Sequence, residues 1–299
     1  MNAESGTADS VTEGLTDVAS ARLALVERLQ EDGVLTHPRL RDALSLLDRE
    51  TLDGFDRPTL LDLGSGTGQV PAALLPAVPR VTRLDLVDRD SDMLRTAAEQ
   101  LRPLHGQAAV AFHAVPAEAS SAPVDGYKAD LVTCARAFHW LDRPAVLRTV
   151  DRVTGPTAAV AVMGDGSLWT YGAHWIAALK ALIQSYLGDG RRAGTTGTYT
   201  EPSSHYEDDL AESAFSKVTE YRFPVRRTWT PDQVVGCLRS TSFAHPASFD
   251  EPDTPPEQAG RHARFEREAH ALLEEYVHGE GLVEDAVFTV LLARRGGAV

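Results

Sequence analysis

Three glycines that directly follow a mostly apolar run constrain this sequence more than any other feature. The run Leu60–Leu63 has the character of a buried strand, and it is followed at alternate positions by Gly64, Gly66 and Gly68. Without Cβ atoms, these residues let the backbone take unusual φ values and let a ligand approach the main chain closely. Pro71 then suits the first turn of a helix. The stretch therefore predicts a parallel strand, a ligand-binding turn and a helix.

Beyond this turn, strand-like and helix-like segments alternate along the chain. Apolar runs typical of strands occupy 60–63, 81–87, 110–114, 129–134 and 158–163, and helical periodicity occupies 91–101 and 146–153. This alternation predicts parallel strands joined by right-handed crossovers, with helices on both faces of the sheet. Two further strands, expected at 218–225 and 286–293, suit a hairpin at the sheet edge. Between them, Thr230-Pro231-Asp232-Gln233 has the residues of a capping box at the start of a helix. The predicted fold is α/β, a doubly wound, mostly parallel seven-stranded sheet with an antiparallel C-terminal strand.

The same pattern divides the chain into four segments. They are an N-terminal helical segment (1–56), the half of the core that carries the glycine turn (57–163), an insertion (164–215) and a C-terminal part that completes the core sheet (216–299). The N-terminal helices are either a packing layer or a lid over a ligand. The insertion contains a helix-like run at 174–187 and is rich in tryptophan and tyrosine. It is either a substrate cap or a satellite hydrophobic cluster.

The composition narrows the classes of partner. A formal net charge of −14 argues against nucleic acid, because phosphate backbones are bound by clustered Lys and Arg. Cys134 and Cys237 lie far apart and form neither a metal motif nor a disulfide framework, which favours a reducing compartment. No apolar run approaches the roughly 18 residues of a membrane span. We therefore expect a cytoplasmic protein with a small-molecule substrate and no membrane or nucleic-acid partner.

The spacing of the glycines separates two classes of cofactor. A dinucleotide fingerprint reads G-x-G-x-x-G, whereas Gln69 stands at the position of its third glycine and the turn reads G-x-G-x-G. A pyrophosphate-binding turn is therefore disfavoured. Asp62 can fix the turn by accepting backbone N–H bonds, or it can meet a cationic amino group. Asp88, at the end of the second strand, is placed to accept hydrogen bonds from a ribose diol of either cofactor class.

Several short motifs follow one another in order along the chain. They are Asp62–Gly68, Asp88 followed by Met93, Ala117-Glu118, Ala129–Val132 and Ala137-Phe138-His139-Trp140. Together they resemble the class I S-adenosylmethionine-dependent methyltransferases over about residues 57–165, and most of all the group that acts on small molecules. Arg239–Ser242 also resembles the tail of that group. The chain lacks an Asn-Pro-Pro-Tyr-like stretch after the fourth strand, which tells against methylation of DNA bases.

The resemblance implies S-adenosylmethionine as the cofactor and assigns residues to its parts. The amino-acid part is lined by Asp62, Gly64, Ser65 and Gly66 and meets the backbone of Cys134 and Ala135, the ribose is held by Asp88, and the adenine lies near Arg89 or Met93, with Ala117 and Glu118 at its edge. A fold of this family leaves the acceptor and the oligomeric state open, and a homo-oligomer is compatible with the sequence.

Methyl transfer from a sulfonium needs a positioned nucleophile more than a dedicated catalytic group, and positioning alone can supply roughly 7–11 kcal/mol. If the acceptor is a hydroxyl or a protonated amine, a histidine base helps. His139 is the first candidate and His174 the second, each with the alternative of a structural role. A substrate wall is expected from the aromatic residues Trp140, Trp169, Tyr171 and Trp175, with core packing as the alternative. The scattered histidines predict no metal site.

The predicted activity is S-adenosylmethionine-dependent methyl transfer to a nitrogen or oxygen atom of a small molecule, in natural-product or antibiotic biosynthesis by the family resemblance. Three alternatives stay open. They are a nicotinamide-dependent oxidoreductase, a non-catalytic relative that binds the cofactor or a protein partner, and a methyltransferase of protein side chains.

Overall fold

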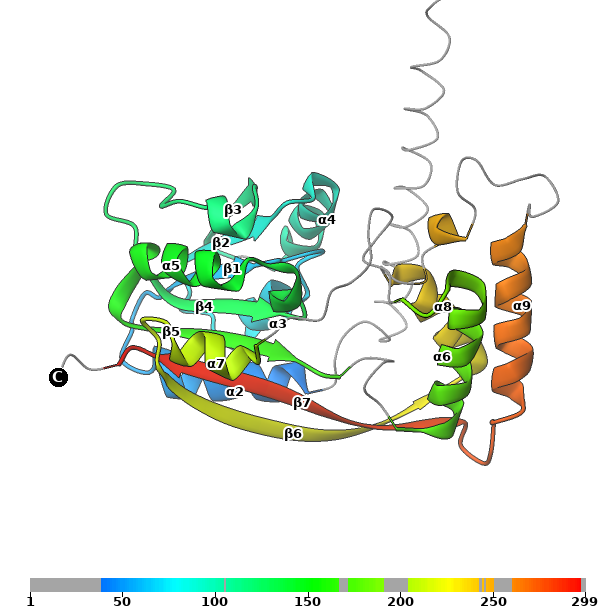
Figure 1. Cartoon of the computed structure of the whole chain (residues 1–299). Helices are drawn as coiled ribbons and strands as arrows, with labels where there is room; N and C mark the ends of the chain where they lie inside the picture. The colour runs from blue at the N-terminus through cyan, green and yellow to red at the C-terminus, as the bar shows by residue number, and fades with distance from the viewer. Residues whose placement is uncertain are drawn as a thin grey trace, which may run out of the picture. The chain divides into compact units, whose positions relative to one another are not determined.

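The computed structural model describes residues 39–104, 106–166, 172–190, 204–241, 244, 246–249 and 260–296. They fall into two compact units (Figure 1). The first, called the core unit, takes its residues from 38–166, 202–225 and 287–299, and the second, called the helical unit, takes its described residues from 167–201 and 226–286. This division differs from the four segments expected above. Residues 202–225, which span the end of the expected insertion and the start of the C-terminal segment, belong to the core unit. Most of the C-terminal segment belongs to the helical unit, together with part of the insertion.

A seven-stranded sheet confirms the predicted fold class. Its spatial order is β3-β2-β1-β4-β5-β7-β6. The strands are β1 Thr59–Leu63, β2 Arg83–Asp88, β3 Ala109–Ala114, β4 Ala129–Ala135, β5 Thr154–Gly164, β6 Lys217–Trp229 and β7 Leu282–Arg294. β1 pairs in parallel with both β2 and β4, and β5 pairs in parallel with β4 and antiparallel with β7. The strand order reverses between β1 and β4, which is where open α/β sheets bind ligands.

Helices cover both faces of this sheet in the core unit. They are α2 Leu40–Leu47 with the π-helical turn η1 Asp48–Leu52, α3 Gln69–Ala77, α4 Ser91–Leu101, α5 Arg143–Val153 and α7 Tyr206–Ala211, with the 3₁₀ turns η2 Ala117–Ala119 and η3 Phe138–Trp140. Successive strand residues alternate between two apolar clusters, so that Leu60 packs with α2, α3 and α4, and Leu61 packs with α5 and α7. The core therefore lies in two layers, one on each face.

Local capping signals explain where several helices begin. The Asp90 carboxylate accepts hydrogen bonds from the N–H groups of Asp92 and Met93 and so caps α4. Thr230 and Gln233 form the capping box that the sequence predicts, and they start α8, which spans Pro231–Ser240. Side-chain acceptors satisfy N–H groups that a helix leaves unpaired at its N-terminus.

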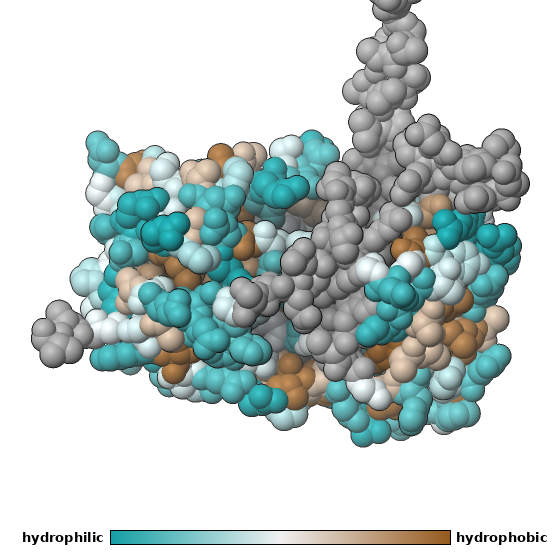
Figure 2. Space-filling model, in the orientation of Figure 1, coloured by the Kyte–Doolittle hydropathy of each residue, from teal (hydrophilic) through white to brown (hydrophobic). Residues whose placement is uncertain are grey.

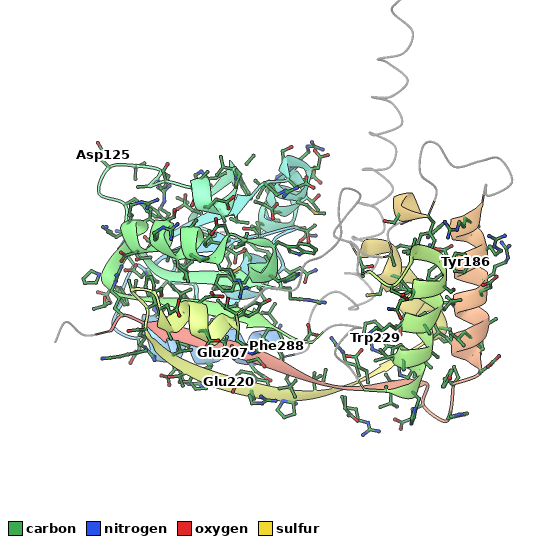
Figure 3. The ribbon with its side chains drawn as sticks, viewed as in Figure 1. Asp125, Tyr186, Glu207, Glu220, Trp229 and Phe288 are labelled. Atoms are coloured by element: carbon green, nitrogen blue, oxygen red, sulfur yellow. The ribbon has the colours of Figure 1, made fainter. Side chains whose placement is uncertain are left out.

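The helical unit has an apolar core of its own. α6 His174–Leu187, α8, the 3₁₀ turn η4 Pro246–Ser248 and α9 Arg261–Glu274 belong to it. Tyr186 lies on α6 (Figure 3). Its ring packs edge-on against Phe265 of α9, with ring centroids 5.4 Å apart. The shared cluster explains why the helices after residue 225 group with α6 rather than with the core sheet.

The last two strands depart from the expected hairpin. β6 and β7 are neighbours at the sheet edge, as expected, but residues 230–281 between them carry α8, η4 and α9 instead of a tight turn. Each of these strands contributes residues to both units. The hairpin prediction is wrong because the segment between the two strands is helical, as the capping box at Thr230 already indicates.

Hydrophilic residues cover much of the surface in the view of Figure 2, and hydrophobic residues show there as small patches. Among the described residues, the large hydrophobic side chains that stay exposed are Leu104, Phe112, Val124 and Trp140. A search of the described helices found none with the length and apolar character needed to span a lipid bilayer.

Candidate functional site

The glycine turn lies at the carboxyl ends of β1 and β2. The N–H groups of Gly64 and Ser65 both donate to the Val87 carbonyl, at 2.8 and 3.2 Å. The Ser65 hydroxyl donates to the Asp62 carbonyl at 2.9 Å, and the Gly68 N–H donates to the Ser65 carbonyl at 2.9 Å. The turn is thus held by the main chain of both strands before any ligand arrives.

The three glycines have different structural reasons to be glycine. All three have positive φ angles. A Cβ at Gly64 would lie 2.3 Å from the Ala137 Cβ, and one at Gly68 would lie 3.0 Å from the Ala97 Cβ, whereas one at Gly66 would meet nothing within 4 Å. Gly64 and Gly68 therefore serve close packing, and Gly66 borders open space that a ligand can approach.

Alanine substitutions separate these roles. Gly64→Ala is expected to lower the free energy of unfolding by about 2–3 kcal/mol, because overpacking adds to the strain of a left-handed alanine. Gly66→Ala is expected to cost only about 1 kcal/mol, since the strain alone remains. Urea denaturation of the two variants measures the difference. Equal losses would contradict the assignment of Gly64 to packing.

Asp62 is a buried carboxylate beside the turn, on β1. Its side chain accepts a hydrogen bond from the Thr133 hydroxyl on β4 at 2.5 Å, and only 2% of the residue is exposed. Burial raises the pKa of Asp62 from 3.8 to about 7, against the opposing effect of the Thr133 hydrogen bond. This group can change charge near neutral pH, and a nearby ammonium would favour its ionised form.

Asp88 ends β2 with a carboxylate that is already oriented. One oxygen accepts the Gly66 N–H at 2.8 Å, and the other accepts the Asp90 N–H at 2.9 Å. The side chain is half-buried, and a carboxylate has about four lone-pair sites, so acceptor capacity remains for a ligand hydroxyl. The hydrogen bond from the Gly66 N–H thus links the orientation of the Asp88 carboxylate to the conformation of the glycine turn.

The remaining residues expected at the cofactor lie on the same edge of the sheet. Met93 is half-buried in the first turn of α4, and Arg89 is exposed. Ala117 is buried in η2, whereas Glu118 is exposed and its carbonyl accepts a hydrogen bond from the Thr149 hydroxyl of α5 at 3.0 Å. That bond fixes η2 against α5.

Cys134 and Ala135 form the end of β4. The Cys134 side chain is buried in the apolar cluster under α5, and burial raises the pKa of its thiol. A neutral buried thiol is a poor nucleophile, so this residue can serve a ligand only through its backbone.

His139 and Trp140 lie together on η3, just beyond β4. Their ring centroids are 4.7 Å apart, His139 is half-buried, and Trp140 is 44% exposed. Phe138 between β4 and these rings is buried and meets the Tyr206 ring of α7 edge-on at 5.3 Å. The histidine is therefore held on a packed turn rather than on a free loop.

A buried arginine ties this turn to α7. Arg143, only 6% exposed, pairs with the Asp209 carboxylate at 2.5 Å, donates to the Ser204 carbonyl at 3.2 Å and lies over the Tyr206 ring. The sequence reading missed this anchor. Arg143 lies more than 60 residues from these partners in the chain, and nothing in the local pattern links them.

The other expected residues lie elsewhere. His174 is exposed at the start of α6 in the helical unit. Trp175 is buried in the core of that unit, where its Nε1–H donates to the Val283 carbonyl at 2.8 Å, so its indole is engaged in packing. Trp169 and Tyr171 lie outside the described residues. Within the described part of the chain, no three His, Cys, Asp or Glu side chains are grouped to hold a metal ion.

The segment that carries the site is similar to known methyltransferases. Residues 61–160 match a family described as methyltransferase domain. An uncharacterized methyltransferase of Mycobacterium tuberculosis (strain H37Rv) is 25% identical over 184 residues, which span 62% of this chain and 64% of that protein. Malonyl-(acyl-carrier protein) O-methyltransferase of Paenibacillus sp. (strain JDR-2) is 26% identical over 211 residues, 68% of this chain and 72% of that protein.

Among solved structures, the cyclase SpnF matches with a TM-score of 0.47 and 15% identity, over 86% of this chain and 82% of that one. The matched segment 61–160 contains the glycine turn, Asp88, η2 and η3. Over residues 61–160 the chain is therefore similar to the methyltransferase domain family, and both of these curated relatives are named as methyltransferases.

Proposed function

We propose that this protein transfers a methyl group from S-adenosylmethionine to a nitrogen or oxygen atom of a small molecule. The observation that carries the proposal is the joint geometry of Gly66 and Asp88. An oriented carboxylate accepts the N–H of a glycine that faces open space, at the strand switch point of the sheet. A ribose diol needs such an acceptor, and an amino-acid moiety needs such an unobstructed backbone.

The residues present fit this cofactor. Asp88 would accept from the ribose hydroxyls, and the backbone of Gly64, Ser65 and Gly66 would line the amino-acid part. The Asp62 carboxylate would pair with the ammonium group of the cofactor. The backbone carbonyls of Cys134 and Ala135 would accept further hydrogen bonds from that group. The adenine would lie near Arg89 or Met93 and η2. When bound, the cofactor supplies an electrophilic methyl group, so the protein has to position the acceptor and exclude water.

His139 is the proposed base of the reaction. Its imidazole would take the proton that a hydroxyl or ammonium acceptor loses, at whichever ring nitrogen faces the acceptor, and Trp140 would cover one side of the acceptor. His174, in the helical unit, is the second candidate. Trp169 and Tyr171 stay proposed members of the aromatic substrate wall.

The setting proposed for this reaction is the biosynthesis of a natural product in the cytoplasm. The two cysteines, neither of them in a disulfide, fit a reducing compartment. The Paenibacillus relative is named for methyl transfer to oxygen on an acyl-carrier protein, which supports an oxygen acceptor without identifying one. The net charge of −14 supports a substrate other than nucleic acid.

Asp88→Ala tests cofactor binding. Losing a charged acceptor is expected to raise the dissociation constant of S-adenosylhomocysteine about 10- to 100-fold, the equivalent of about 1.5–3 kcal/mol. Isothermal titration calorimetry measures it directly. Asp92→Ala is the matched control, because this carboxylate pairs with Arg95 on the outer side of α4 and its loss should leave the affinity unchanged. A wild-type protein that binds neither S-adenosylmethionine nor S-adenosylhomocysteine would refute the proposal.

His139→Ala tests the base. The variant is expected to lower the turnover number about 10²-fold or more, while its affinity for S-adenosylhomocysteine stays within about threefold of wild type. The acceptor is found first, by transfer of a radiolabelled methyl group to a panel of phenols, amines and acids. His174→Ala serves as the comparison. An unchanged turnover number in His139→Ala would show that His139 is not the base and that its side chain serves packing on η3.

A further inference from the structure

Arg136 has a backbone conformation that the surrounding fold imposes on it. It follows β4 directly and is the one non-glycine residue with positive φ, at 54°, in the described part of the chain. A left-handed conformation costs a residue of this kind about 1–2 kcal/mol. The Arg136 N–H donates to the Met163 carbonyl of β5 at 2.8 Å, which holds the turn in place. Strain of this kind gathers at ligand sites, so its position calls for a functional reason.

The side chain of Arg136 is anchored at one end and open at the other. Its Nε lies 3.5 Å from an oxygen of Asp165, a carboxylate that is only 1% exposed, whereas the arginine side chain is 59% exposed. A Cβ at Gly164 would lie 3.8 Å from the Arg136 Cγ, so the stem of the arginine passes over this glycine. The buried carboxylate thus lies beside the Nε edge of the guanidinium, while most of the arginine side chain is exposed.

The location places this guanidinium beside the proposed reaction. Arg136 comes one residue after Ala135 and three before His139, at the carboxyl ends of β4 and β5. The same edge of the sheet carries Asp62 and Asp88, and the chain has a net charge of −14. An anionic acceptor would be repelled from such an edge unless a fixed cation met it. A planar guanidinium binds carboxylates through paired N–H donors.

We propose that Arg136 binds a carboxylate of the methyl acceptor, so that the substrates of this protein are small organic acids. This inference rests on the proposed function. Asp165 acts as a positioning residue, since it orients the guanidinium from below without facing the acceptor. The strained backbone aims the arginine side chain from the turn that also carries His139.

The test uses the complex with S-adenosylhomocysteine and ¹⁵N NMR of arginine side chains, with benzoate as the probe and benzamide as its uncharged control. The Arg136 Nε–H signal is assigned from its loss in Arg136→Gln. Benzoate is expected to shift this signal saturably, and benzamide to leave it in place. Arg89, an exposed arginine near the end of β2, is the control and should not shift. Arg136→Gln should raise the benzoate dissociation constant at least tenfold.

Arg136→Gly keeps the test independent of folding. Glycine relieves the positive φ, so this variant is expected to be at least as stable as wild type and still to lose benzoate binding. Equal shifts with benzoate and benzamide, or no shift at Arg136, would overturn the proposal. So would weaker binding of S-adenosylhomocysteine to Arg136→Gly, because that result would assign the guanidinium to the cofactor's own carboxylate. Failure of wild type to bind S-adenosylhomocysteine would instead refute the proposed function.

Discussion

Replacing Arg143 with alanine is expected to lower the free energy of unfolding of the core unit by about 3–5 kcal/mol. The reason is that the Asp209 carboxylate would stay buried with its charge uncompensated, and the Ser204 carbonyl and Tyr206 ring would lose their cation. Urea denaturation, with hydrogen exchange of the amides in β1 and β4 as the probe, measures the effect in the core unit itself. We also expect early exchange in α7, because Arg143 joins this helix to η3.

Two variants check this assignment. Arg95→Ala removes an exposed pair with Asp92 and should cost less than about 1 kcal/mol. Arg143→Met combined with Asp209→Leu replaces the buried pair by apolar side chains, and it should recover much of the stability that Arg143→Ala loses. If Arg143→Ala cost no more than Arg95→Ala, the buried pair would have no anchoring role.

The stability of the ligand-free protein is expected to fall with rising pH because of Asp62. The pKa of Asp62 in the folded protein is about 7, above its ordinary value of 3.8, so the folded state binds this proton more tightly than the unfolded chain does. The stabilisation from the protonated carboxyl is therefore complete below about pH 4 and is lost as pH rises to about 7. At about 1.4 kcal/mol for each pKa unit, the loss is about 4 kcal/mol.

Asp62→Asn isolates this effect, because an amide mimics the protonated carboxyl and its oxygen can still accept from Thr133. Urea denaturation of both proteins between pH 4 and pH 8 is expected to show similar stability at the acid end and a growing advantage for Asp62→Asn above it. Asp92→Asn, on the surface of α4, should follow wild type throughout. Parallel profiles for wild type and Asp62→Asn would show that Asp62 is ionised in the folded protein over the whole range.

The parts of the fold that the sequence predicted are those set by local pattern. The strand, glycine turn and helix around Gly64 are found where expected, and α6 runs from His174 to Leu187 as its periodicity indicates. The Thr230 capping box also forms as expected. In each case the residues that determine the structure are neighbours in the chain.

The parts that the sequence did not predict depend on contacts between distant residues. α7 is only six residues long, and it is held by Arg143 rather than by a strong pattern of its own. The grouping of α8 and α9 with α6 depends on a shared apolar core. The three glycines look alike in the sequence, and only the short distances from Gly64 to Ala137 and from Gly68 to Ala97 show that two of them serve packing.

β6 and β7 are the outgoing and the returning strand of residues 226–286. The chain leaves the core on one strand and returns on its neighbour, and Arg226 and Asp285 form an ion pair at 3.5 Å on these two strands. The pairing of β7 with β5, from Ala159 with Arg294 to Gly164 with Thr289, lies wholly in the core. Replacing residues 226–286 would leave the residues of the glycine turn, Asp88 and His139 in the chain, but it would remove α8 and α9, which bury the apolar face of α6.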